Sequence, residues 1–159
     1  MPETTTTTTT TTTDICLEHK IELGLMAELV KRTYFASGGA GAGTLMLNSM
    51  DNLSEERPAK YIVVHALPCA TVAPGMPFRK VSVKIVALTH IPTHRDGKLC
   101  KILYNECFQF LSGLTKATLS TATGLTIDGI VQAQGEQAFE PIKDYQILVA
   151  TCDVYLTKN

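Results

Sequence analysis

The segment Phe78–His90 constrains the fold of this chain more than any other, because its residues alternate in polarity. An extended segment places alternate residues on opposite faces. One face would carry Val81, Val83, Ile85 and Ala87, and the other Lys80, Ser82 and Lys84. This pattern is typical of a strand in an antiparallel sheet that is buried on one face and solvated on the other near its start. The chain therefore needs an apolar cover for one face of a sheet.

Further periodic segments predict the rest of that sheet and its cover. Strands are expected at 59–67, at about 124–134 and at 144–157, and the last of these lies inside the sheet because its centre is apolar on both faces. Helices are expected over 15–35 and from 98 to about 112. The order α-β-β-α-β-β predicts an α+β domain, with a mostly antiparallel four-stranded sheet and two helices on one face.

The length and composition fit one folded domain behind a short arm. A chain of 159 residues with 45% hydrophobic residues has enough apolar material for a single core. Thr4–Thr13 is a homopolymeric tract that cannot bury enough apolar surface to offset its ordering entropy. The sequence therefore predicts a flexible threonine-rich arm over residues 1–13 and a single α+β domain over 14–159.

The charge balance and the cysteines exclude several classes of protein. Lys plus Arg number 14 and Asp plus Glu 15, so there is no basic excess of the kind that a dedicated nucleic-acid binder uses against phosphates. The longest apolar runs are far shorter than the roughly 20 residues of a membrane-spanning helix. The five cysteines are odd in number and form no CxxC pair, which predicts mostly buried thiols in a cytosolic, disulfide-free protein.

The first predicted helix is apolar around much of its circumference. Leu17, Ile21, Leu25 and Leu29 recur at i+4 spacing, and Leu23, Met26 and Val30 fall on other faces. A helix of this kind needs apolar contacts on two sides. Two explanations remain open at this point, a subunit interface and deep packing within one core.

Two segments resemble ligand sites, but neither has the complete pattern. The glycine-rich segment Ser37–Gly43 follows a helix and precedes no lysine, so it predicts a flexible connection and not a phosphate loop. His90 and His94 are four residues apart, but Pro92 interrupts any helix between them and no third metal ligand is evident. We interpret this segment as a solvated loop, with Asp96 as the N-cap of the following helix.

No catalytic constellation stands out either. None of the cysteines lies in a local signature of a cysteine hydrolase, and the seven-residue spacing of Cys100 and Cys107 places both near one stripe of a helix. Glu136 and Glu140 lie in a predicted loop, where nothing fixes their geometry as an acid–base pair. The sequence predicts no catalytic, cofactor-binding or metal-binding residue.

The order and size of these elements resemble one protein family. The elements that carry the likeness are the helix 15–35, the strand Lys60–Val64 after Pro58, the alternating strand Lys80–Leu88, the helix Lys98–Leu111 and the closing strand Tyr145–Leu156. Together they resemble the tail terminator proteins of long-tailed bacteriophages, also called tail completion or head–tail joining proteins. The resemblance covers nearly the whole chain after the threonine arm and includes no diagnostic motif.

The resemblance implies a structural virion protein of the tail and neck, assembled in the host cytoplasm. Members of the family form a six-membered ring that caps the tail tube, ends its growth and offers a surface to the head-side connector, while DNA passes through the lumen. No enzymatic activity, cofactor or membrane contact is implied. The partners expected for this chain are copies of itself in a hexamer, the tail tube protein and a head-side connector or stopper protein.

The predicted interface combines the first helix with two connecting segments. The loop 68–78 is expected to be mobile in the free protein and to become ordered against tail-tube or head-side protein. The predicted interface residues are Leu17, Ile21, Leu25, Met26, Leu29, Met76, Phe78 and Phe139. Two other functions remain open: a different head–tail connector, such as a stopper or head-completion protein, and a small α+β enzyme or ligand-binding module.

Overall fold

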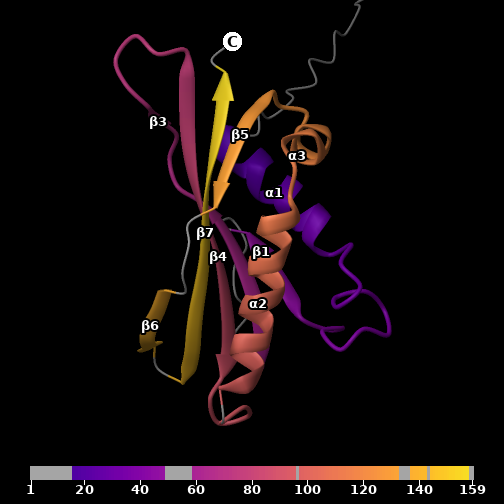
Figure 1. Cartoon of the computed structure of the whole chain (residues 1–159). Helices are drawn as coiled ribbons and strands as arrows, with labels where there is room; N and C mark the ends of the chain where they lie inside the picture. The colour runs from indigo at the N-terminus through magenta and orange to yellow at the C-terminus, as the bar shows by residue number, and fades with distance from the viewer. Residues whose placement is uncertain (1–15, 49–58, 96, 133–136, 143, 158–159) are drawn as a thin grey trace, which may run out of the picture.

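The computed structural model describes residues 16–48, 59–95, 97–132, 137–142 and 144–157, the segment 137–142 by its backbone alone. Along the described residues, one helix and four strands are followed by two helices and three strands, and Figure 1 shows their arrangement. The elements are α1 (Leu17–Leu29), β1 (Leu45–Asn48), β2 (Lys60–Ala66), β3 (Ala70–Thr71), β4 (Phe78–His90), α2 (Lys98–Gly113), α3 (Lys116–Thr123), β5 (Ile127–Gln132), β6 (Gln137–Ile142) and β7 (Tyr145–Thr157).

The strands form one mixed sheet built around the long pair β4 and β7. These two strands pair antiparallel over 13 residues each, from Phe78 opposite Thr157 to His90 opposite Tyr145. The strand order is β1-β2-β4-β7-β5, with β3 also on β4 and β6 also on β7. The α+β class is confirmed. The predicted four-stranded sheet and the order α-β-β-α-β-β are wrong, because the described residues form seven strands, of which β1 runs parallel to β2, and three helices.

The elements that the sequence did not predict have weak local signals. The strands β1 and β3 have four and two residues, too few to show an alternation. The strand β6 contains Pro141, which favours a loop interpretation. The helix α3 is rich in Thr and Ser and buries Leu119 alone; Thr115 caps it by accepting a hydrogen bond from the Thr118 N–H at 3.2 Å.

All three helices cover the same face of the sheet (Figure 1). The strand residues beneath them alternate, as the polarity pattern of Phe78–His90 predicts. The central members of this core are Ile62 and Val64 from β2, Val81, Val83 and Ile85 from β4, Ala150, Cys152 and Val154 from β7, and Cys100, Leu103 and Cys107 from α2. The predicted placement of the helices on one face is therefore correct.

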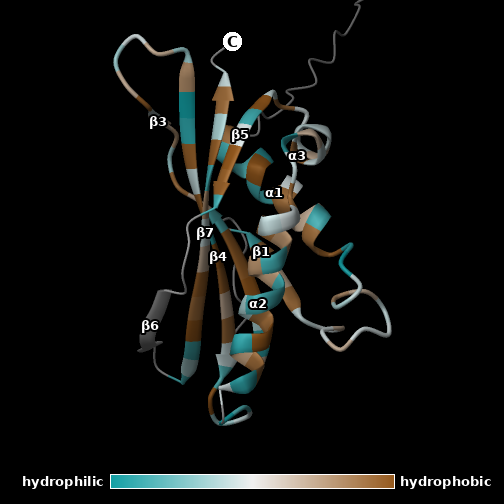
Figure 2. Ribbon diagram, viewed as in Figure 1, coloured by the Kyte–Doolittle hydropathy of each residue, from teal (hydrophilic) through white to brown (hydrophobic). Residues whose placement is uncertain are grey.

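The face without helices has two halves of different chemistry. Near the start of β7 it carries a second buried cluster of Leu47, Tyr61, Leu88, Tyr145, Ile147 and Val149. Toward the end of β7 it carries Lys80, Ser82 and Lys84 beside Thr151 and Asp153. Figure 2 shows the corresponding change along β7, from hydrophobic in its first half to mixed in its second half.

The first helix packs on two sides within its own chain. Ile21, Leu25 and Leu29 are fully buried in the core, and α3 packs along the side at Gly24, where an added Cβ would lie 2.5 Å from Thr123 Cγ2. Deep packing therefore explains the apolar row of Ile21, Leu25 and Leu29, while Leu23 and Val30 remain exposed. The helix also ends at Leu29 and not at Phe35 as predicted.

The glycine-rich segment is a packed run of turns and not the flexible connection predicted for Ser37–Gly43. The Gly41 N–H donates to the Tyr34 carbonyl at 2.8 Å, and the Gly39 N–H donates to the Ala36 carbonyl at 2.8 Å. A Cβ on Gly41 would lie 2.1 Å from Tyr34 Cε1, so glycine allows the tyrosine ring to lie directly on the backbone. The segment 49–58 lies outside the described residues.

One buried hydroxyl group predicts a stabilising substitution. Thr89 on β4 is fully buried, and its Oγ1 has no hydrogen-bond partner among the described residues. Because burying an unpaired hydroxyl is unfavourable, Thr89→Val is expected to raise the free energy of unfolding by about 1 kcal/mol. Urea denaturation followed by circular dichroism measures this change. A loss of stability would show that the hydroxyl has a partner.

Candidate interaction site

A hairpin formed by β3 and the start of β4 projects from the sheet on the side away from the helices (Figure 1). Its two strands pair at Ala70 opposite Lys80 and at Thr71 opposite Arg79. The connecting turn contains Gly75 with φ of 80°. The β4 arm is also paired with β7 as far as Phe78, so the sheet supports one arm of the hairpin along its whole length.

Three large apolar side chains of this hairpin are exposed. The exposed fractions are 45% for Val72, 52% for Met76 and 37% for Phe78. We call these three residues the hairpin patch. Exposed apolar side chains that gather on a projecting element are typical of a protein–protein contact.

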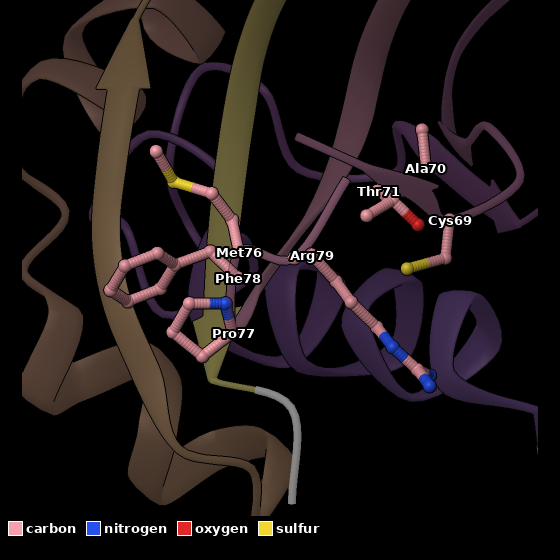
Figure 3. Close-up of a pocket in the computed structure, with 8 residues that line it drawn as sticks. Cys69, Ala70, Thr71, Met76, Pro77, Phe78 and Arg79 are labelled. Atoms are coloured by element: carbon pink, nitrogen blue, oxygen red, sulfur yellow. The ribbon is translucent and has the colours of Figure 1, made fainter. Parts of the chain in front are cut away.

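The hairpin encloses a hollow of about 430 Å³ with two chemically different sides. Figure 3 shows Met76, Pro77 and Phe78 on one side, while the Arg79 side chain extends toward the side of Cys69. The hollow is also lined by Ala70, Thr71 and Gly75. It therefore offers apolar contacts next to one cationic group.

The Cys69 thiol in this hollow is not arranged as a nucleophile. Burial raises its pKa, the nearby Glu18 carboxylate raises it further, and the Arg79 guanidinium opposes both. Because the thiolate is the reactive form, these surroundings favour an unreactive thiol at neutral pH.

Two carboxylates of α1 bind the segment Ala66–Cys69, where the chain passes from β2 into the hairpin; we call this segment the root of the hairpin. Glu22 Oε1 accepts a hydrogen bond from the Ala66 N–H at 2.8 Å, and Glu18 Oε1 accepts one from the Cys69 N–H at 2.7 Å. Among the described residues, the parallel strand β1 pairs with β2 as far as Val64. The two carboxylates provide acceptors for backbone N–H groups that follow that pair, at Ala66 and Cys69.

Glu22 is fully buried although it carries a carboxyl group. Its Oε2 lies 3.3 Å from His19 Nδ1, and its Oε1 lies 3.7 Å from His65 Nδ1. The hydrogen bond from Ala66 and the neighbouring imidazoles provide the polar contacts that a buried carboxylate requires.

The structure separates the predicted interface residues into four groups. Met76 and Phe78 are exposed in the hairpin patch, and Leu17 and Met26 are half-buried on α1. Phe139 lies in β6, and its side chain is outside the described part of the chain. The other three, Ile21, Leu25 and Leu29, lie in the core of the chain itself and offer no surface to a partner in this conformation.

The predicted interface does not include the apolar residues that α1 exposes. Leu23 and Val30 are 39% and 45% exposed, and Ala27 between them is exposed as well. These residues follow i, i+4, i+7 spacing and form an outer apolar row opposite the core. The signal was present in the sequence, but a helix with two apolar rows does not indicate which row faces the sheet.

The histidine segment after β4 has local contacts of its own. His90 Nδ1 lies 2.9 Å from Thr93 Oγ1, and the His94 N–H donates to the His90 carbonyl. The N-cap of α2 is Gly97 with φ of 65°, so the prediction of Asp96 as the N-cap is wrong; Asp96 itself lies outside the described residues. Within the described ranges, no group of three or more His, Cys, Asp or Glu side chains could hold a metal ion.

The cysteines differ in exposure, which predicts an order of chemical reactivity. Cys100, Cys107 and Cys152 are buried as predicted, Cys69 is half-buried and Cys16 is exposed. Burial raises the pKa of Cys107 to about 12, with a smaller contribution from the Glu106 carboxylate. Burial also raises the pKa of Cys152 to about 12, with a smaller contribution from the Asp153 carboxylate.

At pH 8 these two thiols are expected to react with iodoacetamide only after unfolding, because almost none of either is thiolate in the fold, while Cys16 reacts at once. Because the fold raises both pKa values, the protonated thiols of Cys107 and Cys152 stabilise the folded state. This contribution is fully present below their unfolded pKa near 9 and is lost as the pH rises toward 12. Mass spectrometry of the labelled native protein measures the order. Labelling of Cys107 at the rate of Cys16 would contradict the packing described here.

Comparison with known proteins adds no family to this description: no protein-family model matches the chain, and no curated protein sequence matches it. None of the helices among the described residues is both long and apolar enough to span a membrane.

Proposed function

We propose that this chain is a structural virion protein that forms a ring on the tail tube of a long-tailed bacteriophage. The ring ends tail growth and joins the tail to the head-side connector, with DNA passing through its lumen. The virion neck is then its location, after assembly in the host cytoplasm. The proposal rests on the resemblance in the order and size of the predicted elements and on one observation, the hairpin patch.

The hairpin patch supports an assembly role for a physical reason. Val72, Met76 and Phe78 lie on an arm that leaves the sheet, so a partner can cover them without displacing any part of the core. A patch on a projecting element can contact a different surface of the next copy of the chain. Such a head-to-tail contact forms a closed ring when the rotation from one copy to the next divides a full turn evenly. The second exposed row, Leu23, Ala27 and Val30, lies on a separate element and offers another surface for contact.

The test is the oligomeric state of the purified full chain. Sedimentation velocity and negative-stain images are expected to show closed rings, most simply hexamers, alone or on addition of the tail tube protein. A chain that stays monomeric at high micromolar concentration with and without that protein would overturn the proposal. Binding to a head-side connector in the absence of any binding to tail tube protein would favour a stopper or head-completion role.

A further inference from the structure

We infer that Glu18 positions the docking hairpin, holding its β3 arm from the first turn of α1 without itself touching the partner. This inference rests on the proposed function, in which the hairpin is a docking element. The contact joins Glu18 and Cys69, which are 51 residues apart in sequence. Glu18 lies on a helix that is fixed in the core, and Cys69 precedes an exposed arm.

The two arms of the hairpin are supported unequally. The β4 arm pairs with β7 continuously up to Phe78 opposite Thr157. The β3 arm has two pairs with β4, and beyond them the Val72 N–H lies at the long distance of 3.5 Å from the Phe78 carbonyl. The position of the β3 arm therefore depends on what holds its root.

The root of the β3 arm has few backbone attachments. The Leu67 N–H donates to the Ser82 carbonyl at 2.8 Å, and Pro68 has no N–H to donate. Cys69 is thus the first residue after Leu67 that can donate from its backbone, and its N–H donates to Glu18 at 2.7 Å. The bond to Glu18 is a charge-assisted hydrogen bond, the stronger kind.

Glu18 lies on a helix that the core fixes in place. It lies in the first turn of α1, where a carboxylate is favoured by the helix dipole. One turn later the Glu22 carboxylate accepts a hydrogen bond from the Ala66 N–H in the same chain segment, and Ile21 and Leu25 fix the helix in the core. The carboxylate of Glu18 therefore connects a rigid element to a weakly held arm.

Fixing the arm before binding favours docking. The hairpin patch includes Val72 on the β3 side of the turn and Phe78 on the β4 side, so their separation depends on where the β3 arm lies. A loop held in its bound conformation loses less conformational entropy when a partner covers it. Loss of the Glu18 carboxylate removes no apolar side chain from the hairpin patch. It should weaken docking because the β3 arm, and with it Val72, is no longer held in one position relative to Phe78.

The experiment compares Glu18→Ala and Glu18→Gln with Glu28→Ala, which removes a carboxylate of the same helix that pairs with Lys31 instead. Amide hydrogen exchange is measured by NMR on each monomer, and urea denaturation checks that the fold is retained. Glu18→Ala is expected to speed exchange at Cys69 and Val72 by about tenfold, the factor that corresponds to roughly 1.4 kcal/mol, with β4 and β7 unchanged. Glu18→Gln keeps an acceptor oxygen and should change less, and Glu28→Ala should match the wild type.

Self-association of the same variants then decides the effect on docking. Glu18→Ala is expected to associate about tenfold more weakly than Glu28→Ala. Unchanged exchange at Cys69 in Glu18→Ala would overturn the inference, and so would faster exchange with undiminished association. If the wild-type chain does not associate at all, the proposed function fails, and the exchange rates alone decide whether Glu18 positions the arm.

Discussion

Replacing Val72, Met76 and Phe78 together by serine is expected to abolish ring formation while the fold survives. The three side chains are between 37% and 52% exposed, so their removal deletes apolar surface that the core does not use. Buried apolar anchors of an interface each cost more than about 1 kcal/mol when truncated, so the triple variant should weaken association by at least about a hundredfold. Sedimentation velocity measures the association, and urea denaturation measures the fold.

A matched control makes the same chemical change elsewhere on the surface. Leu45, Ile102 and Val131 are also large, apolar and exposed, but they lie on three separate elements, β1, α2 and β5. Their joint replacement by serine should leave ring formation intact. If both triple variants lose association equally, general surface hydrophobicity drives it and the hairpin has no special role. If neither does, the contact lies elsewhere.

The parts of the fold that the sequence predicted correctly are those with long regular patterns. The strands β4 and β7 have 13 residues each, and α2 has a polar face opposite an apolar one, so burial on one side is visible over several repeats. Their positions follow from that periodicity to within a few residues. The α+β class and the single covered face follow from the same three elements.

The sequence pattern of the first helix is compatible with two orientations of the helix on the sheet. Its apolar rows, one through Ile21 and Leu25 and the other through Leu23 and Val30, are similar in the sequence. The choice between them depends on α3, which packs at Gly24 and was not predicted because its sequence is poor in strong helix formers. Three of the predicted interface residues, Ile21, Leu25 and Leu29, therefore lie in the row that the core uses.

The candidate site was found in part because its signals are local. Prolines, a glycine and the apolar residues Met76 and Phe78 lie within one connection, which predicted an exposed loop with apolar anchors. The extension of β4 into that loop and the short strand β3 depend on pairing with β7 and β4, which local pattern does not encode. The contact between Glu18 and Cys69 joins residues distant in sequence, so it could be seen only in three dimensions.

Glu22→Ala is expected to lower the free energy of unfolding by about 3 kcal/mol, a large effect for a charged residue on a helix. Glu22 is fully buried, and its carboxylate accepts the Ala66 N–H at 2.8 Å beside the imidazoles of His19 and His65. Truncation removes the acceptor of that buried N–H, which costs about 1 to 3 kcal/mol, and leaves a cavity in addition. Urea denaturation monitored by circular dichroism measures the loss.

The isosteric variant Glu22→Gln separates the acceptor from the charge. Its side-chain oxygen can still accept the Ala66 N–H, and its volume fills the same space, so the acceptor role predicts a loss of about 1 kcal/mol or less. Glu28→Ala, at a half-buried position of the same helix whose carboxylate pairs with the exposed Lys31, should change stability by about 0.5 kcal/mol at most. If Gln and Ala at position 22 destabilise equally, the negative charge beside the two imidazoles stabilises the fold, and not the hydrogen bond to β2. If neither variant is destabilised, the hydrogen bond between Glu22 and the Ala66 N–H does not contribute to the stability of the fold.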